Sequence, residues 1–400
     1  MISQRQLFLQ HVGQTSDFPL QLEIQHAEGI YMYSSDGKRY IDLISGVSVS
    51  NVGHLHPNIV EAVQNQAGKF MHLMVYGEYI QSPQVEYAKL LTDLLPENLS
   101  SVYFVNSGSE AIEGALKLAK RFTGRTEIIA FKNAYHGSTH GSLSVMGNEE
   151  FKNAFRPLLP DIRFLDFNEE KSLEQITDKS ACVLIEPIQG EGGIMVPKDN
   201  FLQKLRKKCN ETGTLLIFDE IQTGFGRTGS LFAFQEFNVV PDIMTIAKGM
   251  GGGMPIGAFV SSNDIMSAFK TNPILGHITT FGGHPVSCAA AIASLKTIVD
   301  DRLYEKVKQK SQLFRDLLVH PEIKEIRGVG LFMAVELRNF EQVKKVIDIA
   351  VTKGLVTDWF LFHDSAFRIA PPLIITEKQI KEVCEILLEA IDESLNEIEN

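Results

Sequence analysis

Five short apolar runs alternate with helix-like stretches through the middle of the chain, and this alternation constrains the fold most. The runs are SVYFVN (101–106), TEIIAF (126–131), ACVLIEP (181–187), TLLIFD (214–219) and IMTIA (243–247). Their continuous apolar character predicts strands that are buried on both faces, as in a parallel sheet. Between them, SEAIEGALKLAKRF (109–122) and FLQKLRKKCNETG, which ends at a glycine, predict helices. The alternation therefore predicts a doubly wound α/β domain over residues 55–295.

The pattern changes after His284. A long helix-like stretch, predicted to be broken, is followed by strand-like RGVGLFMAVEL, helix-like FEQVKKVIDIAVTKG and strand-like FRIAPPLII. An amphipathic stretch from Glu377 predicts a closing helix. These elements predict a second, smaller α+β domain over residues 296–400, and we expect residues 1–54, with a turn at Ser35-Asp36-Gly37, to join it.

Composition excludes several classes of protein. The chain is 44% hydrophobic and 22% charged, which is typical of a globular protein and not of a disordered one. Its net charge is −11 with no dominant basic run, so we expect no nucleic-acid partner and no membrane partner. The polar N-terminus resembles no signal peptide, and no apolar stretch approaches the roughly 18 residues of a spanning helix. Four dispersed cysteines predict free thiols, and together these features predict a cytoplasmic protein.

Polar residues follow the apolar runs at the point where each predicted strand ends. Ligands of open α/β sheets bind beyond the carboxyl ends of the strands, so these residues are candidates for a site. Ser107-Gly108-Ser109-Glu110 follows the first run. It fits a helix capping box, and it also fits a phosphate cup of backbone N–H groups and hydroxyls. The two interpretations are compatible, because a capped helix end still presents N–H groups.

Lys248 and Asp219 end two neighbouring runs. Lys248 fits a desolvated amine that forms a Schiff base, or alternatively a lysine that reaches solvent. Asp219 fits a carboxylate that keeps a heteroaromatic nitrogen protonated, or alternatively a turn cap or metal ligand. At about 4 Å and an effective dielectric near 20, such an attraction is worth roughly 4 kcal/mol. A phosphate cup, a Schiff-base lysine and an acid for a pyridinium together predict a site for pyridoxal 5'-phosphate.

Other kinds of site fit less well. Gly224, Gly226 and Gly229 match the dinucleotide pattern G-x-G-x-x-G, but Asp219 and Glu220 would repel a pyrophosphate there. His54 and His56 have no third ligand nearby, and His136 and His140 lie in a Gly/Ser-rich segment, so we expect no metal. A serine elbow, G-x-S-x-G, is absent from the sequence.

The sequence resembles class III pyridoxal-phosphate-dependent aminotransferases of fold type I, the group of ornithine, acetylornithine and 4-aminobutyrate aminotransferases. The resemblance runs from about Gly29 to Ile386, and its most specific segment is LLIFDEIQTGFGRTGSLFAFQEFNVVPDIMTIAKGMGGGMPIGA. It is supported by NSGSEAIEGALKLAK, NAYHGST, IEPIQGEGG, TTFGGHP and FRIAPPL. The resemblance implies a large domain with a mostly parallel sheet and a smaller α+β domain.

The resemblance also implies roles for individual residues. Lys248 would form the Schiff base and move the proton, and Asp219 would pair with the pyridine nitrogen. Arg368 would bind a substrate carboxylate, and Glu191 would mask that arginine when an ω-amine binds. Thr280 would complete the phosphate site of a partner subunit, which implies a homodimer. The remaining cofactor-binding residues that it implies are Ser107, Gly108 and Ser109 at the phosphate, Tyr135 on the ring, His136, Glu186, and Gln222 near the phenolic oxygen.

Two residues depart from the family pattern. Ser138 stands where ornithine, acetylornithine and aminobutyrate enzymes have an arginine that grips a donor carboxylate, and His284 stands at a usual asparagine. The leading hypothesis is a ping-pong aminotransferase that moves an ω-amino group to 2-oxoglutarate or pyruvate. The alternatives are a racemase or epimerase on the same fold, and a non-catalytic binding protein that has kept the fold.

Overall fold

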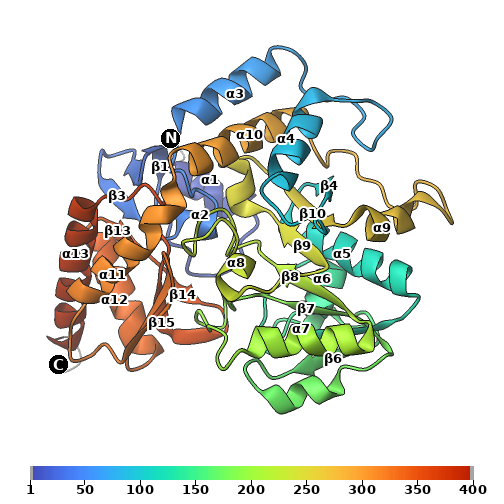
Figure 1. The fold of residues 1–400 in the computed structure, drawn as a ribbon. Helices are drawn as coiled ribbons and strands as arrows, with labels where there is room; N and C mark the ends of the chain where they lie inside the picture. The colour runs from blue at the N-terminus through green and yellow to red at the C-terminus, as the bar shows by residue number, and fades with distance from the viewer. Residues whose placement is uncertain (1–2, 397–400) are drawn as a thin grey trace.

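A seven-stranded sheet forms the centre of the computed structural model, which describes residues 3–396 (Figure 1). The strand β10 runs antiparallel to both of its neighbours, and the other strand pairs are parallel. The mostly parallel sheet that the sequence predicts is therefore confirmed, and each of the five apolar runs forms a strand. In spatial order the strands are β4 (Ser101–Val105), β10 (Gly257–Ser261), β9 (Ile243–Ile246), β8 (Leu215–Asp219), β7 (Ser180–Ile185), β5 (Glu127–Phe131) and β6 (Ile162–Leu165).

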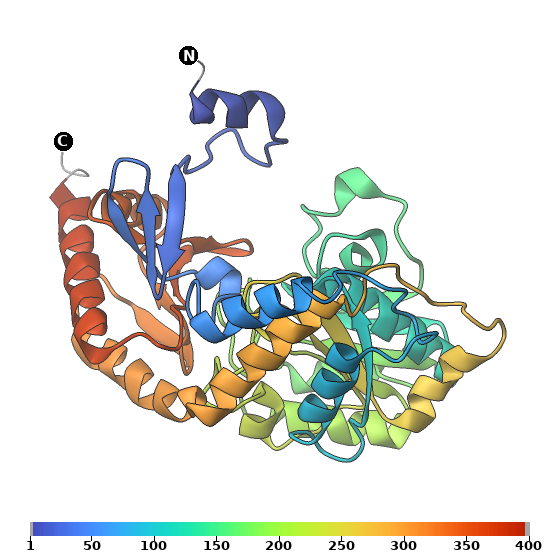
Figure 2. The same ribbon diagram turned by 90° about the horizontal axis from the view of Figure 1, so that it is seen from above.

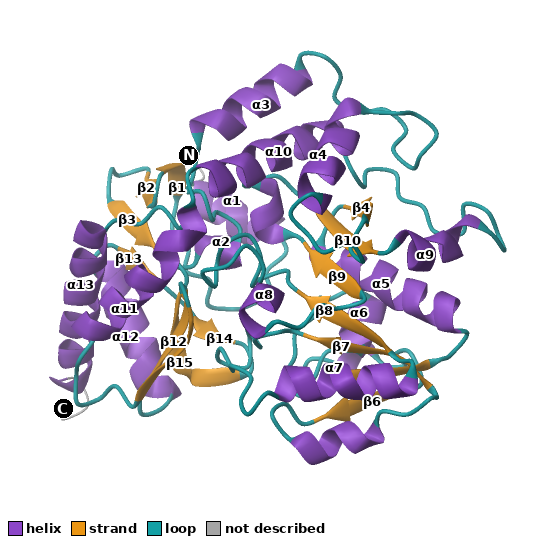
Figure 3. Ribbon diagram, in the orientation of Figure 1, coloured by secondary structure: helices purple, strands orange, loops and turns teal. Residues whose placement is uncertain are grey.

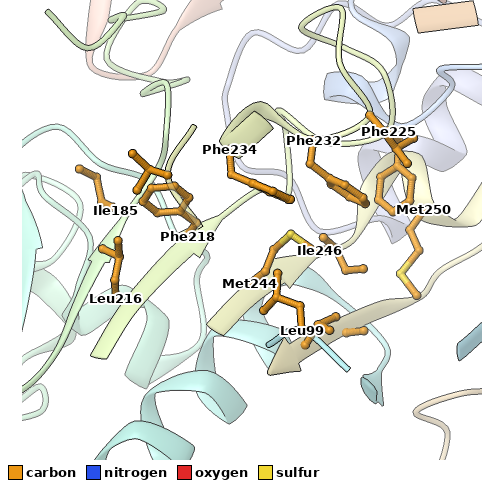
Figure 4. Close-up of a cluster of buried hydrophobic side chains, with 14 of the residues drawn as sticks. Leu99, Ile185, Leu216, Phe218, Phe225, Phe232, Phe234, Met244, Ile246 and Met250 are labelled. Carbon is orange, nitrogen blue, oxygen red and sulfur yellow. The ribbon is translucent and has the colours of Figure 1, made fainter. Parts of the chain in front are cut away.

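Alternate side chains of the central strands pack on opposite faces of this sheet. Leu216 and Phe218 of β8 join one hydrophobic cluster, whereas Leu215 and Ile217 join another. Figure 4 shows the first cluster, in which Phe218 and Leu216 lie near Ile185 of β7. Both faces are covered by helices: α5 (Gly108–Thr123) contributes to the second cluster, whereas α7 (Phe201–Thr212), α4 (Ser82–Thr92) and α10 (Pro285–Asp300) contribute to the first.

The predicted helices begin and end close to the predicted residues. α5 has Ser107 as its N-cap and left-handed Gly124 after its last turn. α7 likewise ends at Gly213, whose φ of +63° a glycine adopts without steric cost. The long stretch after His284 is broken as predicted, into α10 and α11 (Val307–Leu317). The predicted domain boundary at 295–296 falls inside α10, so the domain division stays a prediction.

The N-terminal and C-terminal segments lie side by side next to the main sheet (Figures 1 and 2). They are joined by β3 (Arg39–Asp42), which pairs with β13 (Leu355–Val356). One small sheet has the order β1 (Ile24–Glu28), β2 (Tyr31–Ser34), β3 and β13, and the other β11 (Glu325–Val329), β12 (Phe332–Glu336), β15 (His363–Ile369) and β14 (Trp359–Phe360). The strand-like run 327–337 is thus a hairpin of two strands.

Helices cover the small sheets, and short helices lie within several of the connecting segments (Figure 3). α12 (Phe340–Thr352) packs between β15 and α13 (Glu377–Asn396), and α3 (Pro57–Ala67) packs along α10. Within residues 3–396, no helix combines the length and apolarity that crossing a membrane requires. The short helices are α1 (Gln4–His11), α2 (Ser45–Ser48), α6 (His140–Ser144), α8 (Ala233–Phe237) and α9 (Asn263–Met266).

Candidate active site

A cavity of about 390 Å³ lies where the carboxyl ends of β4, β7, β8 and β9 meet, the edge at which the sequence predicts a site. Most of the residues predicted to bind the cofactor line it together. They are Ser107, Gly108, Ser109, Tyr135, His136, Glu186, Asp219, Gln222 and Lys248.

The N-terminus of α5 forms one wall of the cavity. The Ser107 hydroxyl accepts the Glu110 N–H at 3.2 Å, which is half of the predicted capping box. The Glu110 carboxylate bonds to the N–H and side-chain amide of Asn106 rather than to Ser107. Because the first N–H groups of a helix lack intrahelical partners, this end of a 16-residue helix favours an anion.

The Ser109 hydroxyl also faces this wall, where it accepts the Ser138 N–H at 3.2 Å. Gly137 makes this approach possible, because a Cβ there would lie 2.1 Å from the Ser109 hydroxyl oxygen. Its φ of +122° also disfavours any side chain. The glycine of the Tyr135–Thr139 segment is thus required by the packing of the cavity wall.

Asp219 is fixed at the end of β8 and has a buried histidine partner. One of its oxygens lies 2.7 Å from Nδ1 of His136, and the other accepts the Ile221 N–H at 3.1 Å. Both side chains are almost fully buried, which strengthens their interaction relative to water. His136 therefore orients the carboxylate that the sequence assigns to the cofactor nitrogen.

Lys248 follows β9 and enters the cavity from a strained backbone. Its φ of +47° lies in the left-handed region, which costs a non-glycine residue about 1–2 kcal/mol. Burial lowers the pKa of its amine to about 8, although the carboxylate of Glu191 favours the charged form. A lowered amine pKa is the property that Schiff-base chemistry needs, because the neutral amine is the nucleophile.

Glu186 adds a second carboxyl group near Asp219. It accepts N–H bonds from Tyr135 at 3.2 Å and from Gly190 at 3.0 Å. Burial and the neighbouring Asp219 charge raise the pKa of this carboxyl well above its usual range. Glu186 thus orders the segment that carries Tyr135.

Arg368 and Glu191 form a buried ion pair in which one guanidinium nitrogen contacts both carboxylate oxygens. Nη2 of Arg368 lies 3.0 and 3.1 Å from the two oxygens of Glu191, and Nη1 donates to the Gln222 amide oxygen at 3.3 Å. Burial raises the pKa of the Glu191 carboxyl, but the Arg368 and Lys248 cations outweigh this effect, so the pKa lies below its ordinary value. The pairing that the resemblance implies is present.

The glycine pattern after β8 does not form a dinucleotide loop. Turns occupy residues 221–228, and the five-residue α8 follows them. Glu220 instead caps α8, because its carboxylate accepts the Ala233 N–H at 3.0 Å and the Phe234 N–H at 2.7 Å. Of the two acids that argued against a pyrophosphate, Asp219 thus lines the cavity and Glu220 caps α8.

Thr280 is the one predicted cofactor-binding residue outside the cavity of a single chain. It lies exposed in the loop before α10, where its carbonyl contacts His72 at 2.8 Å. His284, the N-cap residue of α10, lies 5.8 Å from the His72 ring. The assignment of Thr280 to a partner's site stays a prediction.

Sequence reasoning missed several residues of the site. Val49 lines the cavity from the N-terminal segment, and Ile221 lines it beside Asp219. Asp358 lies 2.9 Å from Nε of Arg368. No sequence signal marks Asp358, because its position depends on which strands pair. The other lining residues that were not predicted are Asn106, Gly137, Ala247 and Gly253 to Ile256.

These residues fit pyridoxal phosphate. The cavity presents a helix N-terminus with small residues for a phosphate, a buried carboxylate for a ring nitrogen, and a lysine whose amine is readily neutral. A second observation agrees: Lys248 is the only cation that lines the cavity in the described chain, so the phosphate would rely on helix N–H groups and hydroxyls.

Comparisons with known proteins point to one enzyme family. The family model for class-III aminotransferases matches residues 12–391. The acetylornithine aminotransferase of Methanopyrus kandleri is 38% identical over 384 residues, which cover 95% of this chain and 96% of that protein. The [LysW]-aminoadipate semialdehyde/glutamate semialdehyde transaminase of Sulfolobus acidocaldarius is 36% identical, covering 92% of this chain and 95% of that protein.

A solved structure shows the same fold. The ornithine aminotransferase of Toxoplasma gondii, which holds pyridoxal phosphate at partial occupancy, has a TM-score of 0.90 and 29% identity, covering 98% of this chain and 94% of its own. Matches of this length identify the whole chain with one family and confirm fold type I. The chain therefore belongs to the class-III aminotransferases, and it is a pyridoxal-phosphate-dependent aminotransferase.

Proposed function

We propose that this aminotransferase takes its amino group from a terminal, ω-carbon of the donor and delivers it to a 2-oxo acid, with 2-oxoglutarate preferred over pyruvate. The observation that carries this proposal is the buried pair of Arg368 and Glu191. While the pair is closed, Arg368 is neutralised, which suits an amine with no carboxylate beside the reacting carbon. When Glu191 withdraws, Arg368 can bind the carboxylate of an oxo acid by two parallel hydrogen bonds.

Bound pyridoxal phosphate supplies the electron sink that makes the carbon beside the amino group acidic. We infer that Lys248 holds the cofactor until the donor amine displaces it. The freed Nζ of Lys248 would then take up and release the proton that leaves the donor carbon, so that one amine acts as both base and acid. Asp219 keeps the ring nitrogen protonated, supported by His136 at 2.7 Å. The N-terminus of α5 binds the phosphate.

We infer that residue 138 separates this donor from those of the enzymes with an arginine there. The Ser138 hydroxyl lies 3.2 Å from the Tyr135 hydroxyl, and a serine supplies no charge-assisted bond for a donor carboxylate. We therefore propose a donor whose far end is not held as a carboxylate by residue 138.

A donor panel tests this proposal. Ornithine, acetylornithine, 4-aminobutyrate, lysine, putrescine and β-alanine are each paired with 2-oxoglutarate and with pyruvate, and kcat/KM is measured. We expect putrescine, which has no carboxylate, to exceed acetylornithine, and 2-oxoglutarate to exceed pyruvate. Ser138→Arg should lower the KM for acetylornithine about tenfold, because a bidentate bond to a charged group contributes roughly 1.5–3 kcal/mol.

Two outcomes would overturn parts of the proposal. If acetylornithine is the best donor by a wide margin, the donor named for the Methanopyrus relative applies here and Ser138 does not exclude it. If Lys248→Ala retains both turnover and the visible absorbance of the bound cofactor, the role of Lys248 is wrong. Ser138→Ala is the matched control, since it changes the side chain without adding charge.

We also propose that the working enzyme is a homodimer in which Thr280 of each chain completes the other chain's phosphate site. The exposed position of Thr280 supports this proposal. Apolar side chains on the same loop support it further, because Ile274, Leu275, Ile278 and Phe281 are all exposed.

A further inference from the structure

Arg368 is held on three sides in addition to its contact with Glu191. Its Nε donates to Oδ1 of Asp358 at 2.9 Å, and its Nη1 donates to Gln222 at 3.3 Å. The guanidinium lies over the Phe360 ring, 4.6 Å from the ring centroid. The side chain of Arg368 is only 2% exposed, so each of these partners replaces water that the guanidinium has lost.

The two carboxylates that pair with Arg368 come from different parts of the fold. Asp358 immediately precedes β14, which pairs with β15, and the Arg368 N–H donates to the Asp358 carbonyl at 2.9 Å. Backbone and side chains therefore join the two residues as cross-strand neighbours. Glu191, in contrast, lies in the segment after β7 of the main sheet. Asp358 is thus joined to Arg368 by backbone and side-chain bonds, whereas Glu191 meets Arg368 through its side chain alone and has a second partner for its carboxylate, the Leu361 N–H at 3.2 Å.

This arrangement leaves one edge of the Arg368 guanidinium where one carboxylate can replace another. A carboxylate can approach along the Nε–Nη2 edge or along the Nη1–Nη2 edge, and Asp358 occupies Nε. The remaining edge faces Glu191 and Gln222. If Glu191 withdrew without Asp358 in place, a buried cation would lose its last carboxylate partner, which is costly.

We propose that Asp358 is a positioning residue, a permanent counter-ion that orients Arg368 so that Glu191 and a substrate carboxylate can take turns on its Nη edge. This inference rests on the proposed function, in which Arg368 binds the acceptor. It assigns no contact between Asp358 and the reacting atoms. The residue acts through Arg368 alone.

The test measures binding of glutarate, a dicarboxylate that cannot react, to the holoenzyme by calorimetry. Steady-state kinetics with 2-oxoglutarate as the acceptor accompany it. Asp358→Ala should raise the Kd for glutarate and the KM for the acceptor about tenfold, the range expected for a lost bond to a charged group, with kcat within about twofold. Asp358→Asn keeps an acceptor for Nε and should stay within about threefold. Asp364→Asn, an exposed acid of β15, is the matched control and should change nothing.

Arg368→Lys separates this inference from the proposed function. If that variant binds glutarate as the unchanged enzyme does, Arg368 does not hold the acceptor, and both proposals are overturned. If Arg368→Lys weakens binding and Asp358→Ala does not, only the role of Asp358 is overturned. The role of Asp358 is likewise overturned if Asp358→Ala and Asp358→Asn lower kcat and the unfolding midpoint equally, since that pattern marks a purely structural role.

Discussion

Lys248 shows how neighbouring charges set the reactivity of one side chain. Burial lowers the pKa of its amine to about 8, while Glu191 opposes that effect by stabilising the charged form. Glu191→Gln removes the opposing charge, so the pKa of Lys248 should fall below 8. The neutral, nucleophilic fraction at pH 7 then rises. Stopped-flow absorbance of apoenzyme mixed with pyridoxal phosphate, recorded across pH 6–10, reports this pKa as the midpoint of the rate profile.

Two variants make that measurement specific. Glu150→Gln removes an exposed acid outside the cavity and should leave the midpoint unchanged. Lys248→Ala should show no site-specific imine signal. A midpoint that moves upward in Glu191→Gln would mean that Glu191 does not stabilise the charged amine, and the electrostatic picture of the site would have to be revised.

Among the elements, the short helix α8 is capped by the carboxyl group of Glu220, which is buried and therefore costly to ionise. Glu220 caps α8, yet burial raises its pKa from 4.5 to about 7. A carboxyl whose pKa is higher in the folded than in the unfolded state binds more protons when folded, so the free energy of unfolding falls as pH rises from 4.5 to 7. The loss is roughly 3 kcal/mol and is complete above about pH 7.

Glu220→Gln cannot ionise and should lack this part of the pH dependence. Chemical denaturation at pH 5 and pH 8 gives the comparison. Between these pH values, the free energy of unfolding of the unchanged enzyme should fall by roughly 3 kcal/mol more than that of the variant. Glu150→Gln serves as the control, and equal pH profiles for Glu220→Gln and the unchanged enzyme would contradict the prediction.

Strands were predictable where burial on both faces makes the sequence continuously apolar. They were less predictable where the strand is short, partly exposed or defined mainly by its pairing with a neighbour. The runs that form β7, β8 and β9 are apolar throughout because both faces are buried. β6 was missed because it is four residues long and carries exposed Arg163, and β10 because it follows a cluster of glycines. β4 is an edge strand that pairs only with β10, so it is partly exposed, unlike the fully buried strand that was predicted.

The residues of the site were likewise predictable where they end an apolar run, and not where strand pairing places them. Asp219 and Lys248 were predictable because each directly ends an apolar run, and parallel strands bring such ends together. Asp358 was not, because it faces Arg368 only through the pairing of β14 with β15. Thr280 lies outside the cavity of one chain, so its role was inferred from family resemblance alone.

At the scale of the whole molecule, Arg227 ties the main sheet to the terminal segments. This fully buried residue follows β8 and donates to the Leu331 and Pro371 carbonyls and to the Asn51 side chain. Arg227→Ala leaves these acceptors unpaired and opens a cavity, so the free energy of unfolding should fall by about 3 kcal/mol or more. Fluorescence of Trp359, the only tryptophan, and circular dichroism follow the unfolding.

Arg163→Ala is the control for this loss. Arg163 pairs with Glu127 at 2.9 Å, but its side chain is half exposed, so its removal should cost under about 1 kcal/mol. If Arg227 joins the segments, the fluorescence and dichroism transitions should separate in Arg227→Ala, because the tryptophan reports only the C-terminal segment. Coincident transitions with an unchanged midpoint would show that the hydrogen bonds of Arg227 contribute nothing to stability.

Assembly decides whether one chain makes a complete site. If Thr280 serves the partner's phosphate site, Lys248→Ala and Thr280→Arg each inactivate a homodimer, but for different reasons. A mixed dimer then contains one site with both defects and one site with neither, because Lys248 and Thr280 of the intact site come from opposite chains. Random exchange makes half of the dimers mixed, so activity should recover to about a quarter of the unchanged enzyme.

The recovery follows from two-fold symmetry alone and needs no assumption about the donor. Mass measurement of the holoenzyme first establishes the dimer, and mixing is then performed with differently tagged chains so that exchange is verified directly. Lys248→Ala mixed with Asp219→Ala is the matched control, since both residues belong to the cavity of one chain and no mixed dimer regains an intact site. Verified exchange without recovery would place Thr280 outside the partner's site.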